Sequence, residues 1–279
     1  MIELHPGTRV IDLLNRRALY CGCALTLAFL IAPLVAIMPL SFNSGSFLTY
    51  PLAGLSLRWY SNLVTGGDWL SAVGNSLWVA TAVAVLATPL GTLAALGLAR
   101  LPRPVKPLVM TVLLAPMFVP VIIVAVATYL VYAPLGLADT YSGLILAHTT
   151  LAAPFAVVLI NAALQGVDPS VLRAAASLGA PPPTVMLRVL LPLIAPGVVA
   201  AAVVSFATSF DEIVVALFLA GTEHKTLPMK MFEGARDEIS PAITAASTVL
   251  VMTSLLFLGV VEAVRRRREN NITIRSGGK

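Results

Sequence analysis

Six long apolar segments, separated by shorter polar ones, set the pattern of this chain. They cover residues 19–40, 71–99, 107–132, 142–164, 191–220 and 242–264. A helix needs about 20 predominantly apolar residues to cross the hydrocarbon layer, and each segment reaches that length. In lipid, the backbone N–H and C=O groups of a helix form hydrogen bonds within that helix. The alternation of apolar and polar residues that is typical of membrane β-strands is missing from the sequence. The pattern therefore predicts an all-α polytopic membrane protein with six transmembrane helices.

Composition supports the same class of protein. Hydrophobic residues make up 58% of the chain and charged residues only 11%, whereas soluble domains carry about 25% charged residues. Cys21 and Cys23 lie in an apolar run with a spacing that suits neither a disulfide framework nor a metal site. We expect an N-terminal segment at 1–18, a transmembrane domain at 19–264 and a basic tail at 265–279.

The distribution of Lys and Arg predicts the orientation in the membrane. With six spans, 14 of the 18 basic residues lie on the side that holds both termini and the loops 100–106 and 165–190. Cytoplasmic loops carry the excess of Lys and Arg, so both termini are expected in the cytoplasm of a multi-pass plasma-membrane protein. The run Arg265–Arg268 is typical of contact with lipid phosphates, and no basic domain with interleaved aromatic residues suggests a nucleic acid.

The loop at 165–190, between the fourth and fifth spans, has the signals of a short helix and a sharp turn. Asp168 is a good N-cap with Pro169 at the first helical position. Gly179 suits a left-handed C-terminal stop, and Pro181–Pro183 prevent the helix from continuing until a second one begins near Pro183.

The residue types on this helix favour a docking surface. Ala174 and Ala175 allow another surface to approach closely, while Val171, Leu172, Ala175 and Leu178 form an apolar strip at helical spacing. The alternative is a helix that only lies on lipid head groups, for which bulkier side chains are expected.

The same loop resembles the signature of membrane subunits of binding-protein-dependent ABC importers, written EAA-x3-G-x9-I-x-L-P. Ala174, Ala175, Gly179 and Leu191-Pro192 match it, Val189 replaces Ile, and Arg173 replaces Glu with reversed charge. The resemblance implies a cytoplasmic coupling helix that docks on an ATPase dimer, a second homologous permease subunit, an extracytoplasmic solute-binding protein and a bacterial inner membrane. The expected docking residues are Asp168, Leu172, Arg173, Ala174, Ala175, Leu178 and Gly179.

A second similarity lies further along the chain. The segments SFDEIVVALFLAG from Ser209, TLP from Thr226 and RDEISP from Arg236 resemble permease subunits of the spermidine/putrescine type. This resemblance implies import of a polyamine or a related small solute.

Two adjacent acids interrupt the fifth apolar segment. A charge at the centre of a span costs about 2.5–3.5 kcal/mol on insertion scales, so Asp211 and Glu212 are expected to face a partner or a watery cavity. The segment is also long for one span, and a break near Ser209–Asp211 with Asp211 capping a second helix solves both problems. Two interpretations remain open: a structural cap, or carboxylates that attract a cationic solute in the pathway.

Other functions have weaker signals. No G-x4-G-K-[ST] phosphate loop is present, so ATP hydrolysis is expected from another chain, with no catalytic residue, metal or cofactor in this one. A secondary carrier or channel is the alternative, but it works without an ATPase and so would not need the docking signals of the loop 165–190. An intramembrane enzyme lacks a triad, because Ser142 and His148 do not share a helix face; His148 is expected to make a bundle contact. The charged segment 221–241 is either a solvated loop or part of the outer mouth.

Overall fold

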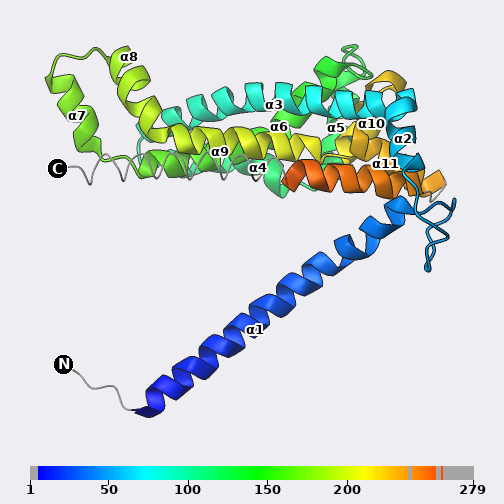
Figure 1. The fold of residues 1–279 in the computed structure, drawn as a ribbon. Coiled ribbons are helices and arrows are strands. Elements are labelled where there is room, and N and C mark those ends of the chain that lie inside the picture. The colour runs from blue at the N-terminus through cyan, green and yellow to red at the C-terminus, as the bar shows by residue number, and fades with distance from the viewer. Residues whose placement is uncertain (1–5, 238–240, 256–258, 260–279) are drawn as a thin grey trace. The chain divides into compact units, whose positions relative to one another are not determined.

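The computed structural model describes residues 6–237, 241–255 and 259, with side chains from residue 17 onward and without that of Asp237. Apart from one isolated antiparallel bridge, Asn43–Leu55, the described secondary structure is helical (Figure 1). The predicted basic tail at 265–279 lies outside the described residues. The helices are α1 (Pro6–Ile37), η1 (Met38–Phe42), α2 (Arg58–Thr65), α3 (Gly67–Arg100), α4 (Lys106–Phe118), α5 (Val121–Tyr132), α6 (Tyr141–Gln165), α7 (Pro169–Ser177), α8 (Pro182–Val185), η2 (Met186–Leu190), α9 (Leu191–Phe210), α10 (Val214–Leu219), η3 (Thr222–His224) and α11 (Leu227–Asp237).

The chain divides into two compact units, and the larger one, residues 66–233, is a helical bundle. Helices α3, α6 and α9 run alongside one another, with α7 and α8 at one end and α5 and α10 at the other (Figure 1). Two apolar clusters form the core. One contains Val83, Leu144 and Leu219, and the other contains Ile160 and Ile194.

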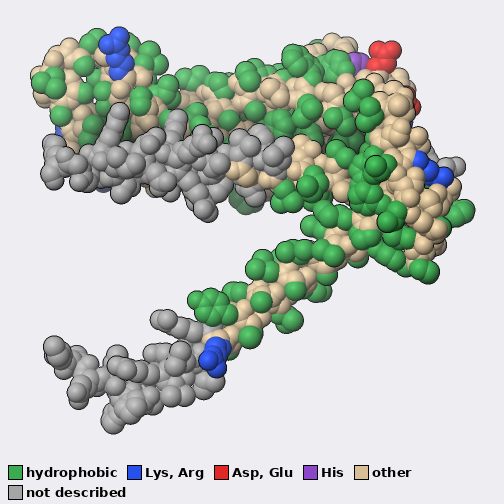
Figure 2. Space-filling view, in the orientation of Figure 1, with side chains coloured by type: hydrophobic (Ala, Val, Ile, Leu, Met, Phe, Trp, Pro, Cys, Tyr) green, Lys and Arg blue, Asp and Glu red, His purple; other side chains and the backbone are tan. Residues whose placement is uncertain are grey.

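The surface of this bundle has the character of a membrane protein. Figure 2 shows hydrophobic side chains along its length, Lys and Arg side chains at the end that carries α7 and α8, and acidic and His side chains at the opposite end. Large apolar side chains such as Leu93, Val112 and Phe118 are more than 60% exposed. Such exposure is expected where lipid is the solvent.

Four described helices are long and apolar enough to cross a membrane: Arg17–Phe42, Gly67–Arg100, Tyr141–Gln165 and Pro182–Phe210. They overlap the first, second, fourth and fifth predicted segments, but the helix in the fifth begins at Pro182 and ends at Phe210, earlier at both ends than the predicted 191–220. The third segment is a bent pair, α4 and α5, with a 96° angle between them. The bend follows from Pro120, which lacks an N–H and forces Val119 into an extended conformation at φ −78° and ψ 131°.

The sixth predicted span is described only in part. An apolar helix covers Pro241–Leu255, and the remainder of the predicted segment, apart from Gly259, falls outside the described residues. The described residues therefore hold four candidate spans, or five if the bent pair counts as one, and a total of six stays a prediction.

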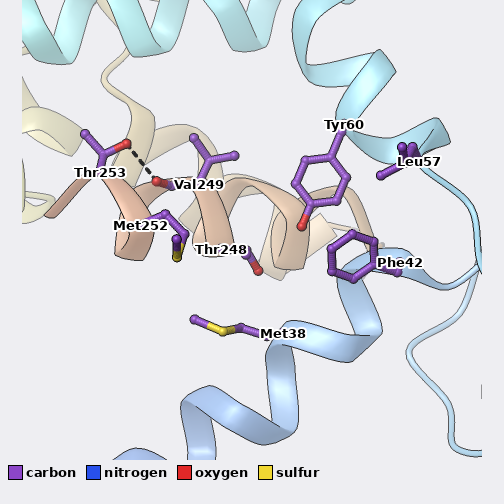
Figure 3. A pocket seen from close by; sticks show the side chains of 8 residues that line it. All are labelled: Met38, Phe42, Leu57, Tyr60, Thr248, Val249, Met252 and Thr253. Atoms are coloured by element: carbon purple, nitrogen blue, oxygen red, sulfur yellow. Dashed lines mark hydrogen bonds between the residues drawn. The ribbon is translucent and has the colours of Figure 1, made fainter. Parts of the chain in front are cut away.

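The smaller unit includes α1, the polar segment after it and the helix Pro241–Leu255. Asn43 organises the polar segment: its Nδ2 donates to the Phe47 carbonyl at 2.9 Å, and its Oδ1 accepts from the backbone N–H of Gly45 and Ala53. This unit contains an apolar cavity of about 650 Å³. Figure 3 shows the side chains that line it: Met38, Phe42, Leu57, Tyr60, Thr248, Val249, Met252 and Thr253.

Candidate functional site

The first part of the site is α7, which the sequence predicts as a short capped helix. Asp168 is its N-cap, with a carboxylate oxygen that accepts from the Ser170 N–H at 2.8 Å, and Pro169 occupies the first turn. That backbone hydrogen bond, helped by the Ser170 side chain, lowers the pKa of Asp168. The carboxylate therefore stays ionised at neutral pH and satisfies one of the N–H groups that a helix start leaves free.

The other end of α7 is a Schellman motif centred on Gly179. Gly179 has a φ of +82°, its N–H donates to Ala176 O at 3.0 Å, and the Ala180 N–H donates to Ala175 O at 3.2 Å. Both bonds satisfy carbonyls that the end of the helix leaves unpaired. The predicted left-handed stop at Gly179 is confirmed.

A second helix leads from this turn back along the bundle. It begins at Pro182, one residue before the predicted start, and continues as α8, the π-turn η2 and α9. The Leu191 N–H bonds to Met186 O, five residues earlier, in the turn directly before Pro192. Because proline has no N–H and its ring clashes with the carbonyl four residues back, a widened turn accommodates it. The Leu-Pro end of the signature therefore has a structural role here.

The helix α7 rests on the bundle by one side only. Leu172 is half-buried and packs beside the cluster that contains Ile160, Leu190 and Ile194. A cavity of about 530 Å³ remains between this turn and the ends of α3 and α6. It is lined by Leu96, Ala99, Arg100, Leu164, Val167, Pro169, Leu172, Ala176, Ala180, Pro182, Val185, Met186 and Leu190.

The structure divides the predicted apolar strip of α7 between two sides. Leu172 and Ala175 are half-buried, whereas Val171 is 43% exposed and Leu178 is 89% exposed. Of the other expected docking residues, Arg173, Ala174 and Gly179 are exposed and Asp168 is the cap.

The second part of the site is the break at the end of α9. The helix ends at Phe210, residues 211–213 are not helical, and α10 begins at Val214, so the predicted break near Ser209–Asp211 is confirmed. The expected capping by Asp211 is wrong: Asp211 closes the end of α9, and Glu212 Oε1 accepts from the Val215 N–H at 2.9 Å. Asp211 lies at the C-cap of α9, one residue further from the start of α10 than Glu212.

Two buried polar side chains fix this break to α6. His148 Nδ1 and Ser209 Oγ are 2.9 Å apart, and both residues are less than 5% exposed. The expected bundle contact of His148 is confirmed at this nitrogen. Sequence reasoning did not identify Ser209 as its partner, because 61 residues separate the two along the chain. His148 Nε2 and the hydroxyl of Ser205, which lies one turn of α9 before Ser209, are also buried.

Beyond α10, the first part of the segment 221–241 is held against α3 and α6. Asn75 Nδ2 donates to the carbonyls of Glu223 and Lys225 at 2.9 and 3.0 Å, and Tyr141 donates to Asn75 Oδ1 at 2.6 Å. Lys225 also forms an ion pair with Glu233 at 2.7 Å. These contacts show that the first part of the segment is ordered.

The fold and these two features define a membrane component of a solute importer. The model of the family described as "Binding-protein-dependent transport system inner membrane component" matches residues 87–270. The chain belongs to this family. It is a multi-pass membrane-spanning subunit of an ABC importer, and that class of protein has a transport role.

Individual relatives are similar over most of the chain. The spermidine/putrescine transport system permease protein PotC of Escherichia coli strain K12 is 32% identical over 88% of this chain and 93% of that protein. The putrescine transport system permease protein PotI of the same strain is 34% identical over 80% of this chain and 82% of that protein. A bacterial ABC transporter involved in the import of the acidic polysaccharide alginate has a chain with the same fold, with a TM-score of 0.71 and 17% identity over 93% of this chain and 99% of that chain.

Proposed function

We propose that this chain is one membrane subunit of an importer for polyamines or similar small cationic solutes. The similarity to PotC and PotI over at least 80% of the chain supports this class of solute. Asp211 and Glu212, at the break between α9 and α10, provide the negative charge that a polyamine requires. The solute passes inward by alternating access between outward-open and inward-open states.

The proposal includes six spans with both termini in the cytoplasm. It joins α4 and α5 into the third span and extends the helix that begins at Pro241 into the sixth. The 14 basic residues on one side support this orientation. The transmembrane domain is then residues 19–264, flanked by the cytoplasmic segment 1–18 and the basic tail 265–279.

The observation that carries the proposal is the capped helix α7 between two spans. Its two ends are fixed by the Asp168 cap and the Gly179 turn. A short rigid helix that continues through one turn into a span can transmit a push to that span. We place a cytoplasmic ATPase dimer against α7, through Asp168, Leu172, Arg173, Ala174, Ala175, Leu178 and Gly179.

The other parts of the transporter come from separate chains. A second homologous permease subunit completes the pathway, and an extracytoplasmic solute-binding protein delivers the solute to the outer ends of the spans. In this proposal the chain itself has no catalytic residue, cofactor or metal. ATP binds to the separate ATPase, because the sequence of this chain lacks a phosphate loop.

The pathway role of the two acids predicts the effect of neutral substitutions. Asp211→Asn and Glu212→Gln should each lower uptake of labelled putrescine and spermidine into vesicles about tenfold, the factor that corresponds to about 1.4 kcal/mol. Complex assembly should not change. Asp68→Asn is the control, because it removes an acid whose side chain is 84% exposed and whose ion pair with Lys230 is a surface contact. Unchanged uptake in both test variants would remove Asp211 and Glu212 from the pathway.

A further inference from the structure

The exposed side of α7 has a defined composition. Ser170, Val171, Arg173, Ala174, Ser177 and Leu178 are exposed and do not line the cavity beside α3 and α6, whereas Pro169 and Ala176 are exposed but line it, and Leu172 and Ala175 are half-buried. Successive residues of an α-helix are separated by about 100° around its axis. These six residues therefore lie on one half of the helix, centred near Ala174, and Leu172, Ala175 and Ala176 lie on the side toward the bundle.

This exposed half divides again into an apolar edge and a polar edge. Val171, Ala174 and Leu178 follow one another at spacings of three and four residues, and so do Ser170, Arg173 and Ser177. Leu178 is 89% exposed, the highest value among the large hydrophobic side chains that the structure describes as exposed. An apolar side chain held this far out by a fixed turn gains stability when another surface covers it.

Arg173 is the single charge on this exposed half, and within the part of the chain that the structure describes it has no acidic partner. In the two loops at this end, 100–106 and 165–190, Asp168 is the one acidic residue in the sequence, and its carboxylate already binds the Ser170 N–H. Arg100, Arg103, Lys106 and Arg188 add further positive charge in or beside these loops.

We propose that Arg173 pairs with a carboxylate of the ATPase subunit, beside a shallow apolar hollow that receives Leu178 and Val171 over Ala174. This inference rests on the proposed function, which places the ATPase at α7. The charges of the contact are then reversed: this chain supplies the cation and the ATPase the anion, whereas a Glu at this position would supply the anion. A guanidinium matches a carboxylate with two parallel hydrogen bonds, so the contact would also orient the ATPase.

A lipid phosphate is the competing anion for Arg173. Helices that lie on lipid carry many Lys and Arg on the polar face and bulky residues on the apolar face. Here the polar edge has two serines and one arginine, and the apolar edge has an alanine at its centre. These residue types favour a fitted protein surface over a bilayer.

A charge-reversal experiment tests this pairing in the assembled transporter. Arg173→Glu should reduce co-purification of the ATPase and solute-stimulated ATP hydrolysis by at least about tenfold, since close charge pairs at interfaces couple strongly. A photocrosslinking residue placed at position 173 should label an ATPase peptide that contains Asp or Glu. Replacing that acid with Arg should restore assembly in the Arg173→Glu transporter and reduce it in the wild type.

Two controls distinguish this inference from the proposed function. Leu178→Asp should abolish ATPase binding whatever the partner of Arg173 is, and Arg188→Glu should leave binding intact. If Leu178→Asp has no effect, the docking site itself is wrong. If Leu178→Asp abolishes binding while Arg173→Glu assembles like the wild type, or the label at 173 reaches only lipid, the acidic partner is wrong and the docking site stands.

Discussion

At the scale of single residues, Gly179 and Asp168 determine where α7 ends and begins. Gly179 adopts a φ of +82°, and a Cβ built on it meets no heavy atom within 4 Å. Space is therefore not the constraint at this position. The constraint is the backbone conformation, because a residue with a branched side chain is strained in the left-handed region.

The change Gly179→Val should separate ATP hydrolysis from transport. A left-handed non-glycine residue costs about 1–3 kcal/mol, so the turn should open and α7 should lose its fixed connection to α9. We expect ATP hydrolysis to continue while solute uptake falls about tenfold or more. Gly179→Asn is the matched control because asparagine tolerates this conformation. Wild-type uptake by the Val variant would contradict the role of the turn.

The change Asp168→Ala should loosen the start of α7, because it removes the side-chain acceptor of the Ser170 N–H. Trypsin cuts after Arg173, so cleavage there in solubilised protein reports local opening, and it should accelerate about fivefold. Asp168→Asn should not accelerate it, because asparagine caps equally well. Equal cleavage of the Ala variant and the wild type would mean that the cap does not hold this helix.

This capping contact also has a defined pH dependence. The Ser170 N–H lowers the pKa of Asp168 in the folded protein. The stability from the cap is therefore complete above the ordinary pKa of an aspartate and is lost as the pH falls through the lowered value. Between about pH 6 and pH 8 the cap should not respond, so any pH dependence of transport in that range comes from other groups.

At the scale of the elements, close backbone approach sets the packing of α3, α6 and α9. A Cβ added to Gly91 of α3 would lie 2.5 Å from the Cβ of Ala156 and 3.0 Å from the Val157 backbone N of α6. A Cβ added to Gly197 of α9 would lie 2.4 Å from the Cβ of Ala163. Small residues allow such contacts between membrane helices.

The change Gly91→Ala should therefore destabilise the bundle by about 1–3 kcal/mol, the usual cost of overpacking. A lower melting temperature in detergent would measure it. Gly97→Ala, in the same helix, is the control, because no heavy atom lies within 4 Å of its added Cβ. If both variants melt at the same temperature, α3 and α6 are not in contact at Gly91.

The sequence predicts these elements well where the signal is local. The apolar segments at 71–99 and 142–164 differ from α3 and α6 by no more than four residues at either end. Both ends of α7 follow from Asp168-Pro169 and Gly179. The choice of Glu212 over Asp211 as the cap of α10 depends on the geometry of the break, which adjacent acids in a sequence cannot reveal.

At the scale of the whole molecule, contacts between distant residues are the part that the sequence does not predict. The bonds from Asn75 to Glu223 and from His148 to Ser209 join residues 148 and 61 positions apart. A polar residue near the end of a span can form a hydrogen bond with any of many partners, and the packing of the bundle determines which one it has. The charge pattern, in contrast, predicts an excess of Lys and Arg at the end of the bundle that carries the loop 165–190, and Figure 2 shows Lys and Arg side chains there. At the opposite end, Lys225 and Lys230 pair with Glu233 and Asp68. Which end faces the cytoplasm remains a proposal.

The proposed mechanism depends most on the contact between α7 and the ATPase, and a single-cysteine crosslink tests that contact directly. The native thiols, Cys21 and Cys23, are both exposed, so they are first replaced by Ser. Leu178→Cys is then treated with a short maleimide–diazirine reagent, whose second group inserts on illumination into any neighbouring side chain, in inverted and right-side-out membrane vesicles. We expect a crosslinked band with the ATPase, and labelling by a membrane-impermeant thiol reagent in inverted vesicles only. Labelling of the introduced thiol in right-side-out vesicles, or no crosslink to the ATPase in an assembled transporter, would contradict this mechanism.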